Sequence, residues 1–328
     1  MRKKLLSAAV AAVMTLSLAA CGTATPTETD DASAENPDAY IVGICEQMEH
    51  VSLSEATRGF KAALTELLGE GNVVFQEQNA GGEQTNCTTI MNGFISDGVD
   101  LILANATWPL QAAASATADI PILGTSVTDY GTALGIEDFS GTVGGNISGT
   151  SDLVDLEAQA EVLHELFPNA KTVGLLYCSG EPNSVYQIET VRGYLEPMGY
   201  ICEVYAFTDV NDLASVTQTA CDNCDVIYIP TDNTVAANTE TVANVVIPVG
   251  VPVVGGDPGI CSGCGVATIA TDYYELGRLT GEMAAQILQG EADISTLAVQ
   301  YGPMQKLYNS ANCEALGVSV PEDYVEVE

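Results

Sequence analysis

The sequence contains the same succession of strands and helices twice. Four short apolar segments, separated by stretches of helical periodicity, run from residue 41 to 125 and recur about 130 residues later, from 172 to 255. The paired segments are Ile41–Cys45 with Thr172–Cys178, Val73–Gln78 with Ile201–Phe207, Leu101–Asn105 with Val226–Pro230, and Pro121–Gly124 with Pro252–Gly255. Short strands that alternate with helices pair in parallel through right-handed crossovers. The repeat therefore predicts an α/β chain of two doubly wound, Rossmann-like lobes, each built on a parallel sheet.

Polar side chains follow the carboxyl ends of the predicted strands in both halves. These clusters are Glu46-Gln47, Asn105-Ala106-Thr107, Ser126-Val127-Thr128-Asp129, Glu181-Pro182-Asn183-Ser184, Thr231-Asp232-Asn233-Thr234 and Gly256-Asp257. In open parallel sheets, ligands bind beyond the carboxyl ends of the strands. We therefore expect a ligand site in a cleft between the two lobes.

The connections between the lobes can also be predicted. The first helix is expected from Ser52 or Ser54 to Leu68, with a serine as N-cap, and lobe two is expected to begin with a helix over 151–167. A strand over 266–270, a helix over 272–288 and an extended piece at 297–300 follow the second repeat. If these segments return to lobe one and then to lobe two, three strands join the lobes as a hinge. Lobe one is then 39–147 plus 268–295, and lobe two is 148–267 plus 296–328.

The first 21 residues have the pattern of a lipoprotein export signal. Arg2-Lys3-Lys4 precede an apolar stretch, which ends in Leu18-Ala19-Ala20-Cys21-Gly22. This ending resembles a bacterial lipobox, which implies removal of residues 1–20 and attachment of lipid to Cys21. An ordinary signal peptide or a single spanning helix is the alternative. Residues 21–38 are rich in Thr, Asp, Glu, Ala and Pro, as in a flexible linker. We expect the chain to sit on the outer face of the cell membrane, held by the lipid anchor alone.

The charge of the chain excludes some classes of partner. Without residues 1–20, six basic residues remain against 44 acidic ones, a formal net charge of −38. Nucleic acids and anionic lipid surfaces carry the same sign of charge. We therefore expect no nucleic-acid partner.

Nine cysteines remain if Cys21 is lipidated, and four of them form two CxxC pairs. Cys221 and Cys224 are predicted at a helix-to-strand turn, and Cys261 and Cys264 in a glycine-rich loop. As a bare pattern, two CxxC pairs are a zinc signature. Disulfides or free thiols are the alternative, because this chain uses cysteine widely as a small apolar residue. Our interpretation includes no metal and no cofactor.

Several strings, spread over almost all of the chain after residue 40, resemble those of one family. They are Val42-Gly43-Ile44 with Glu49-His50, Ala106-Thr107 through Gln111, Val127-Thr128-Asp129, Gly145-Asn146-Ile147-Ser148-Gly149-Thr150-Ser151-Asp152, Asn183-Ser184-Val185, Pro230-Thr231-Asp232-Asn233-Thr234-Val235-Ala236, and Ala267-Thr268 through Asp272-Tyr273-Tyr274-Glu275-Leu276-Gly277-Arg278. The chain resembles bacterial ABC-transporter substrate-binding lipoproteins of the tryptophan/tyrosine type. The resemblance implies a type I periplasmic binding protein fold, an aromatic amino acid as ligand, an ABC permease as partner, and a monomer. Another small solute, such as a nucleoside or a branched-chain amino acid, is the nearest alternative.

An amino acid presents a carboxylate, an ammonium group and a side chain to its site. Basic side chains are scarce, so we expect helix N-termini to bind the carboxylate, with Asn183 and Ser184 as the predicted donors. Asp232, Asp257 and Asp129 follow strand ends and are candidates for the ammonium group. For all of these residues, helix capping or turn formation is the competing interpretation.

The remaining candidates complete the wall of the cleft. Glu46 stands where the resembled family often has an amide, and Trp108, the only tryptophan, stands where that family usually has a small residue or proline. The Trp108 ring is expected to stack on the ligand or to cap the cleft, unless it packs elsewhere. Thr107, Thr128 and Asn233 are the other predicted ligand contacts.

The sequence predicts binding without catalysis. It contains no Ser-His-Asp order, no HExxH motif and no phosphate-binding Gly-Lys string. Cys45 and the CxxC pairs are the only candidates for an enzyme's nucleophile or metal ligands. A secreted enzyme and an adhesin-like surface protein are the alternatives from other classes.

Overall fold

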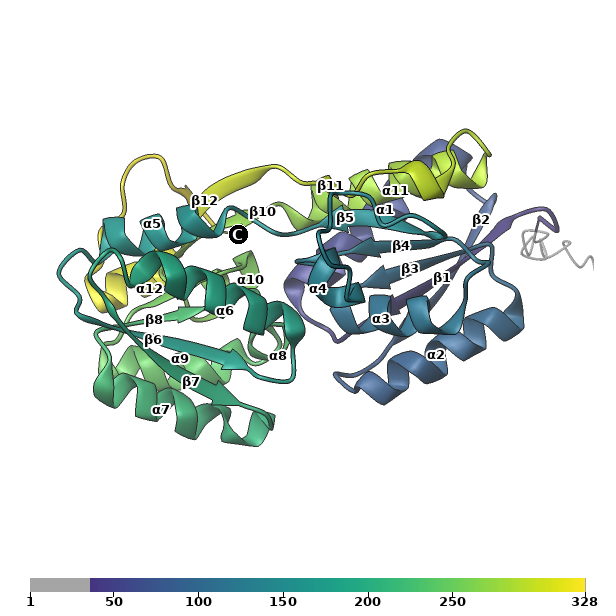
Figure 1. The fold of residues 1–328 in the computed structure, drawn as a ribbon. Helices are drawn as coiled ribbons and strands as arrows, with labels where there is room; N and C mark the ends of the chain where they lie inside the picture. Colours follow the sequence, from purple (N-terminus) through teal and green to yellow (C-terminus); the bar gives the residue numbers. More distant parts are fainter. Residues whose placement is uncertain (1–35, 328) are drawn as a thin grey trace, which may run out of the picture. The chain divides into compact units, whose positions relative to one another are not determined.

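The computed structural model describes residues 36–327, which form two lobes, each with a sheet covered by helices on both faces (Figure 1). The predicted signal peptide, the lipidation site Cys21 and the linker up to residue 35 lie outside the described residues. Within the described residues, no helix is long and apolar enough to span a membrane. The prediction of two α/β lobes is confirmed.

Lobe one is built on a six-stranded parallel sheet in the order β11-β5-β4-β3-β1-β2. Its strands are β1 (Tyr40–Glu46), β2 (Val73–Asn79), β3 (Leu101–Asn105), β4 (Ile122–Thr125), β5 (Ile147–Ser151) and β11 (Gln300–Tyr301). The helices of this lobe are α1 (Val51–Leu68), α2 (Gln84–Asp97), α3 (Thr107–Ala116), α4 (Tyr130–Leu134) and α11 (Tyr273–Leu288), with a 3₁₀ turn at Ile294–Thr296.

The sheet of lobe one has an apolar face on each side because side chains alternate along a strand. In β3, Ile102 and Ala104 pack on the side of α2 and α3, whereas Leu101 and Leu103 pack on the side of α1 and α11. A strand buried on both faces reads as a continuous apolar run, and this is what the sequence shows at 101–104.

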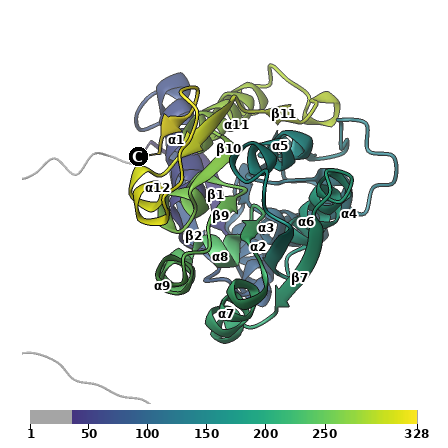
Figure 2. The same ribbon diagram turned by 90° about the vertical axis from the view of Figure 1, so that its left-hand side faces the viewer.

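Helices α1 and α11 lie against each other on one face of lobe one, as both views show (Figures 1 and 2). Their backbones meet at glycines. A Cβ atom on Gly59 would lie 2.0 Å from the carbonyl oxygen of Tyr274, and one on Gly277 would lie 2.0 Å from that of Ala56. Both distances are far inside van der Waals contact, so this helix pair requires the absence of a side chain at both positions.

Lobe two is built on a seven-stranded sheet in the order β13-β12-β10-β9-β8-β6-β7, in which only the β10–β12 pair is antiparallel. Its strands are β6 (Thr172–Cys178), β7 (Ile201–Phe207), β8 (Val226–Ile229), β9 (Val253–Gly255), β10 (Ala267–Thr271), β12 (Met304–Tyr308) and β13 (Val325–Glu326). Its helices are α5 (Leu156–Leu166), α6 (Pro182–Leu195), α7 (Leu213–Asn223), α8 (Asn233–Ala236), α9 (Thr239–Val249), α10 (Pro258–Gly263) and α12 (Ser310–Leu316), with a 3₁₀ turn at Val210–Asp212.

Strand pairing and helix packing indicate where the chain crosses between the lobes. Strand β5 pairs with β4 of lobe one, and β10 pairs with β9 of lobe two, whereas α11 packs on α1 of lobe one. We therefore propose that the chain crosses between the lobes at 152–155, at Asp272 and at 302–303, in place of 147/148, 267/268 and 295/296.

Two predicted helix starts are wrong. The helix expected over 151–167 begins only at Leu156, because 147–151 pairs with β4 as a strand. The N-cap of α1 is His50, not Ser52 or Ser54, and Ser52 lies within the first turn. The Ser52 hydroxyl is therefore available for a contact with the other lobe.

Candidate functional site

Two hydrogen bonds join the strand ends of the lobes. The Ser52 hydroxyl in lobe one donates to Asp257 Oδ2 in lobe two over 2.6 Å, and His50 Nε2 lies 3.1 Å from Asn233 Oδ1. The carboxyl ends of β1, β3 and β4 therefore face those of β6, β8 and β9. We call the buried polar side chains at this junction the interlobe site, and they are Gln47, Ser126, Thr128, Asp152 and Asn183.

Lobe one contributes hydrogen-bond donors to the interlobe site. Gln47 is fully buried, and its Oε1 accepts from the backbone N–H of Trp108 over 3.2 Å. This contact fixes the orientation of the amide, so Nε2 is the free end, and it has no partner among the described residues. The hydroxyl of the buried Ser126 also has no partner in residues 36–327. Both groups can donate to an anionic oxygen.

Ser126 is held in an uncommon backbone conformation. Its φ is 55°, in the left-handed region that favours glycine. Such conformations cost about 1–3 kcal/mol and are found mainly at functional sites, where the surrounding structure holds them in place. The Ser126 backbone therefore supports a binding role for this turn after β4.

Asp152 lies where the chain leaves β5 for lobe two. It is 4% exposed, its Oδ2 accepts from the Tyr273 hydroxyl over 2.7 Å, and its Oδ1 has no partner in the described part of the chain. Burial raises the pKa of Asp152 from an ordinary value of 3.8 to about 6, and nearby Asp257 adds to the rise, although the hydroxyls of Tyr273 and Thr128 oppose it. A cation at Oδ1 would restore the charged form.

Asn183, at the start of α6, contributes an acceptor from lobe two. Its Nδ2 donates to Glu181 Oε2 over 3.1 Å and to the Thr231 carbonyl over 2.9 Å. Both partners accept only, so the amide cannot be reversed, and Oδ1, which has no partner among residues 36–327, is the free end. The amide group that was expected to donate to the ligand carboxylate is thus already used within lobe two, and the free carbonyl oxygen suits an ammonium group instead.

The predicted role of Ser184 and Asp232 in binding is also not supported by their contacts. Asp232 Oδ2 accepts from the Ser184 hydroxyl over 2.8 Å and from the Cys178 N–H over 2.7 Å, and Oδ1 caps α8 through the Val235 N–H. Burial, followed by the charge of Glu181, raises the pKa of Asp232. Both carboxylate oxygens are thus used inside lobe two, and the helix-capping interpretation fits Asp232.

Three further predicted residues serve as caps or bridges. Asp257 caps α10 through the Ile260 N–H and accepts the bond from Ser52. Asn233 faces His50 through Oδ1 and donates to Glu181 Oε2 through Nδ2 over 2.7 Å. Asp129 caps α4 through the Thr132 N–H over 2.6 Å. Asp257 and Asn233 therefore belong to the lobe-to-lobe contact, and Asp129 lies at its edge.

The other four predicted residues separate into two groups. Thr107 and Thr128 are buried at strand ends of lobe one, and Thr128 contacts Asp152. Glu46 instead accepts from Thr57 over 2.9 Å and lines a hollow with Gln78 and Asn79, at the open edge formed by β1 and β2. Trp108 lies in a groove between α2 and α3. The prediction that Trp108 stacks on a ligand in the cleft is not supported by this position.

The interlobe site lacks a positive charge of its own. None of the six basic side chains within residues 36–327 is buried. Five of them pair with surface carboxylates, and Lys171 is exposed. Buried Asp152 therefore has no cationic partner from the described chain.

A hollow of about 340 Å³ marks the mouth of this junction. It lies between α4 of lobe one, through Thr132, and the start of α6, through Pro182, Val185 and Tyr186. Burial and the nearby charge of Asp129 raise the pKa of Tyr186, so a neutral phenol lies beside the mouth.

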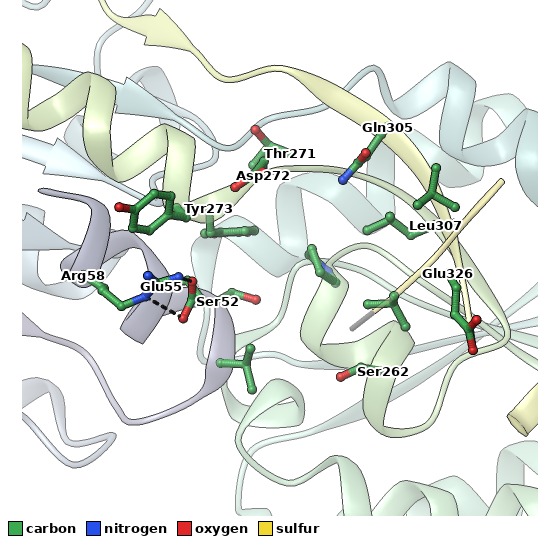
Figure 3. A pocket seen from close by; sticks show the side chains of 15 residues that line it. Ser52, Glu55, Arg58, Ser262, Thr271, Asp272, Tyr273, Gln305, Leu307 and Glu326 are labelled. Carbon is green, nitrogen blue, oxygen red and sulfur yellow. Dashed lines mark hydrogen bonds and ion pairs between the residues drawn. The ribbon is translucent and has the colours of Figure 1, made fainter. Parts of the chain in front are cut away.

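A larger hollow, of about 540 Å³, lies between α1 of lobe one and β12 of lobe two, and Ser52, which donates to Asp257, is among the residues that line it (Figure 3). The Arg58–Glu55 ion pair lies at one end of it, and Gln305 and Leu307 of β12 lie at the other. None of the ten predicted site residues, all of which are in the described range, lines it.

The cysteines other than Cys21 are free thiols in the described residues, and all but the partly exposed Cys202 are buried. No group of three or more potential metal ligands occurs within residues 36–327. Cys221 and Cys264 pack in the same apolar cluster of lobe two. These side chains act as small apolar residues in the structure.

The titration of Asp152 predicts that stability depends on pH. A carboxyl group with a raised pKa in the folded state stabilises that state below its unfolded pKa, and the contribution is lost as the pH rises through the folded pKa. Between pH 4 and 7, the ligand-free wild-type protein should lose up to about 3 kcal/mol more stability than Asp152→Asn, since one pKa unit corresponds to about 1.4 kcal/mol. Urea denaturation of both proteins at several pH values measures this difference. If the free energy of unfolding changed with pH to the same extent in both proteins, the raised pKa of Asp152 would be contradicted.

Comparison with known proteins places this geometry in a family. The model of the family described as ABC transporter substrate binding protein matches residues 41–327. The chain belongs to this family, and it is a substrate-binding protein of an ABC transporter with the type I periplasmic binding protein fold. A curated relative, the tyrosine-binding protein of Clostridioides difficile strain R20291, is 31% identical over 300 residues, which cover 88% of this chain and 85% of the relative.

Two solved structures add detail on the arrangement of the lobes. The ABC domain from Streptococcus pneumonia in complex with L-Trp is 29% identical, with a TM-score of 0.83, and covers 88% of this chain and 100% of that one. The second is the ligand-free, open structure of a substrate binding protein with adhesive properties from Clostridium difficile, which is 32% identical. It also covers 88% of this chain and 100% of that one, but its TM-score is 0.67. The present structure is thus more similar to the complex with L-Trp, in agreement with its two lobe-bridging hydrogen bonds.

The sequence prediction missed three residues of the interlobe site. Gln47 and Ser126 stand in the polar clusters after β1 and β4, and Asp152 ends one of the family strings. The available signal was position, because Gln47 is the first residue beyond β1 and Asp152 the first beyond β5. The predicted aspartates Asp129, Asp232 and Asp257 instead cap α4, α8 and α10.

Proposed function

We propose that the chain binds an aromatic amino acid at the interlobe site and delivers it to the permease of its transporter. The observation that carries this proposal is the buried carboxylate of Asp152, for which the described chain supplies no cation. An isolated buried charge is costly, whereas a paired one is tolerated. An ammonium group on the ligand would provide the pair, and the free carbonyl of Asn183 is a second acceptor for it.

The opposite end of an amino acid fits lobe one. Gln47 Nε2 and the Ser126 hydroxyl are donors without a partner in residues 36–327, and together they suit a carboxylate. Hydrogen bonds to charged groups are worth about 1.5–3 kcal/mol each. The site thus offers donors on lobe one, an acceptor on lobe two and an anion at the crossing, which matches a zwitterion.

The aromatic character of the ligand rests on the relatives. One is named for tyrosine and another holds L-Trp, and both match this chain over 88% of its length. Burial of an aromatic ring removes about 150–250 Å² from water and can supply much of the affinity.

Closure of the lobes is the proposed mechanism. The Ser52–Asp257 and His50–Asn233 contacts form only when the strand ends meet, and a ligand held from both lobes favours the same state. A ligand shifts an equilibrium by its difference in affinity for the two states. The closed form would then dock on the permease, and opening would release the ligand.

The proposal also covers the attachment, the location and the oligomeric state of the protein. We propose that Cys21 carries a lipid anchor, that the folded part lies outside the cell membrane, and that it acts as a monomer without catalysis. The family membership supports the transporter context, and the lipobox-like sequence at 18–22 supports the anchor. Radiolabelled palmitate incorporation into wild type but not Cys21→Ala would test the anchor.

Isothermal titration calorimetry of residues 22–328 with the common amino acids tests the ligand. We expect saturable binding of Tyr, Trp or Phe, with one ligand per chain and an unchanged amino acid recovered afterwards. A ligand at 100 times its dissociation constant should also stabilise the protein by about 2.7 kcal/mol. Binding of a nucleoside, a sugar or a branched-chain amino acid in preference would contradict the aromatic assignment while leaving the fold unaffected.

A further inference from the structure

We propose that lobe one carries a second binding site, for a neutral saccharide, in the groove between α2 and α3. This groove has a volume of about 380 Å³ and is separate from the interlobe site. Its walls are the exposed sides of the two helices, which pack against each other under the sheet (Figure 1). The residues that line it are Gln84, Thr85, Thr88 and Asn92 of α2, and Trp108, Gln111, Ala112, Ser115 and Ala116 of α3.

The groove has no charged residue, which is unusual for this chain. Acidic residues number 44 in the sequence, against nine basic ones. All nine lining residues are neutral. A charged ligand would lose its hydration here without an ionic partner, so the groove selects against ions and favours a neutral molecule.

The lining matches the two kinds of surface that a sugar presents. Trp108 is half-buried, with one part of its ring packed on the core of lobe one and the rest open to the groove. A rigid aromatic face suits the C–H face of a pyranose ring. Gln84, Thr85, Thr88 and Asn92 are exposed and carry amides and hydroxyls, which donate to and accept from sugar hydroxyls.

The spacing of these residues places them along one line. Gln84, Thr88 and Asn92 lie at intervals of four residues on α2, and Trp108, Ala112 and Ala116 do so on α3. Residues at this interval share a helix face. The two alanines opposite the amides keep the groove open, and its volume lies within the ~300–1,000 Å³ of small-molecule pockets.

The groove is chemically independent of the interlobe site. Trp108 contacts Gln47 only through its backbone N–H, which any substitution except proline retains. Substitution of Asn92 or Gln84, exposed residues of α2 that have no role at the interlobe site, should leave the affinity for the amino acid within twofold of wild type. Failure of the saccharide site and failure of the amino-acid site can then be told apart.

Intrinsic fluorescence gives a direct test because Trp108 is the only tryptophan. Residues 22–328, saturated with phenylalanine, would be titrated with glucose, galactose, N-acetylglucosamine, lactose and maltose. We expect at least one of them to cause a saturable change in emission. In Asn92→Ala and Gln84→Ala, which retain the fluorophore, the dissociation constant should rise at least fivefold, and calorimetry should show a similar loss in Trp108→Ala but a smaller one in Trp108→Phe.

Matched controls guard against unfolding and non-specific effects. Tyr301→Ala removes another exposed aromatic side chain of lobe one, far from the groove in sequence, and should not change saccharide binding. Thermal denaturation of each variant confirms folding. The proposal is overturned if no saccharide gives a saturable change, or if the change is the same in Asn92→Ala and Gln84→Ala as in wild type.

Discussion

Asp152→Asn should weaken the binding of an aromatic amino acid by about 10- to 100-fold. The substitution keeps the size of the side chain and its contact with Tyr273, but it removes the negative charge that faces the interlobe site. A hydrogen bond to a charged group contributes about 1.5–3 kcal/mol, and 1.4 kcal/mol corresponds to a factor of ten in affinity. Calorimetry above pH 7, where the wild-type carboxyl group is ionised, measures the loss.

Asp155→Asn is the matched control for this experiment. Asp155 lies three residues further along the same crossing, is exposed, and caps α5 through the N–H groups of Glu157 and Ala158. Asparagine caps helices about as well as aspartate. The affinity of Asp155→Asn should therefore equal that of wild type. Equal affinities of Asp152→Asn and wild type would show instead that Asp152 does not bind the ammonium group.

The same model predicts proton release when the ligand binds. With a pKa of about 6 in the ligand-free protein, Asp152 is partly protonated at pH 6, and an ammonium group beside it would lower that pKa. Binding enthalpies measured at pH 6 in buffers of different ionisation enthalpy should differ for wild type and agree for Asp152→Asn. A dependence on the buffer would show that Asp152 releases a proton when the ligand binds, which a side chain that only packs against the ligand would not do.

The strands and their order along the chain could be predicted because their signal is local. Thr172–Cys178 and Ile201–Phe207 were predicted at their observed bounds, since continuous apolar runs bounded by helical segments define buried parallel strands. Strand β5 was missed. Its sequence, Ile147-Ser148-Gly149-Thr150-Ser151, has little periodicity, and it is a strand because it pairs with β4. Tertiary pairing, which no local pattern encodes, decided that segment.

In the candidate site, the sequence could predict which residues lie near the strand ends, but not which atoms are free to bind a ligand. Asp232 and Asp152 are both aspartates beside strand ends, and the sequence favoured Asp232. Their difference lies in their partners, since the Asp232 carboxylate accepts from three donors within lobe two while Asp152 has one free oxygen. For Asn183, even the end of the amide that faces the ligand depends on Glu181 and Thr231. Position could be predicted, but hydrogen-bond direction could not.

Gly277→Ala should destabilise the protein by about 3 kcal/mol, in the upper range for an overpacked core. The added Cβ atom would lie 2.0 Å from the Ala56 carbonyl oxygen and 2.7 Å from its carbonyl carbon. Both atoms belong to the backbone of α1, so no side-chain rotation can relieve the clash. Helices α1 and α11 would have to separate, which loosens the apolar cluster that includes Phe60 and Met283.

Gly93→Ala is the matched control, because it is the same substitution inside another helix of the same lobe. Nothing lies within 4 Å of a Cβ atom built on Gly93 in α2. Alanine there should be neutral or stabilising by about 0.5–1 kcal/mol, since it lowers the entropy of the unfolded chain. Urea denaturation midpoints should therefore move in opposite directions for the two variants. If both variants were stabilised, the higher helix propensity of alanine would dominate at 277, and the close approach of α1 and α11 would not require a glycine there.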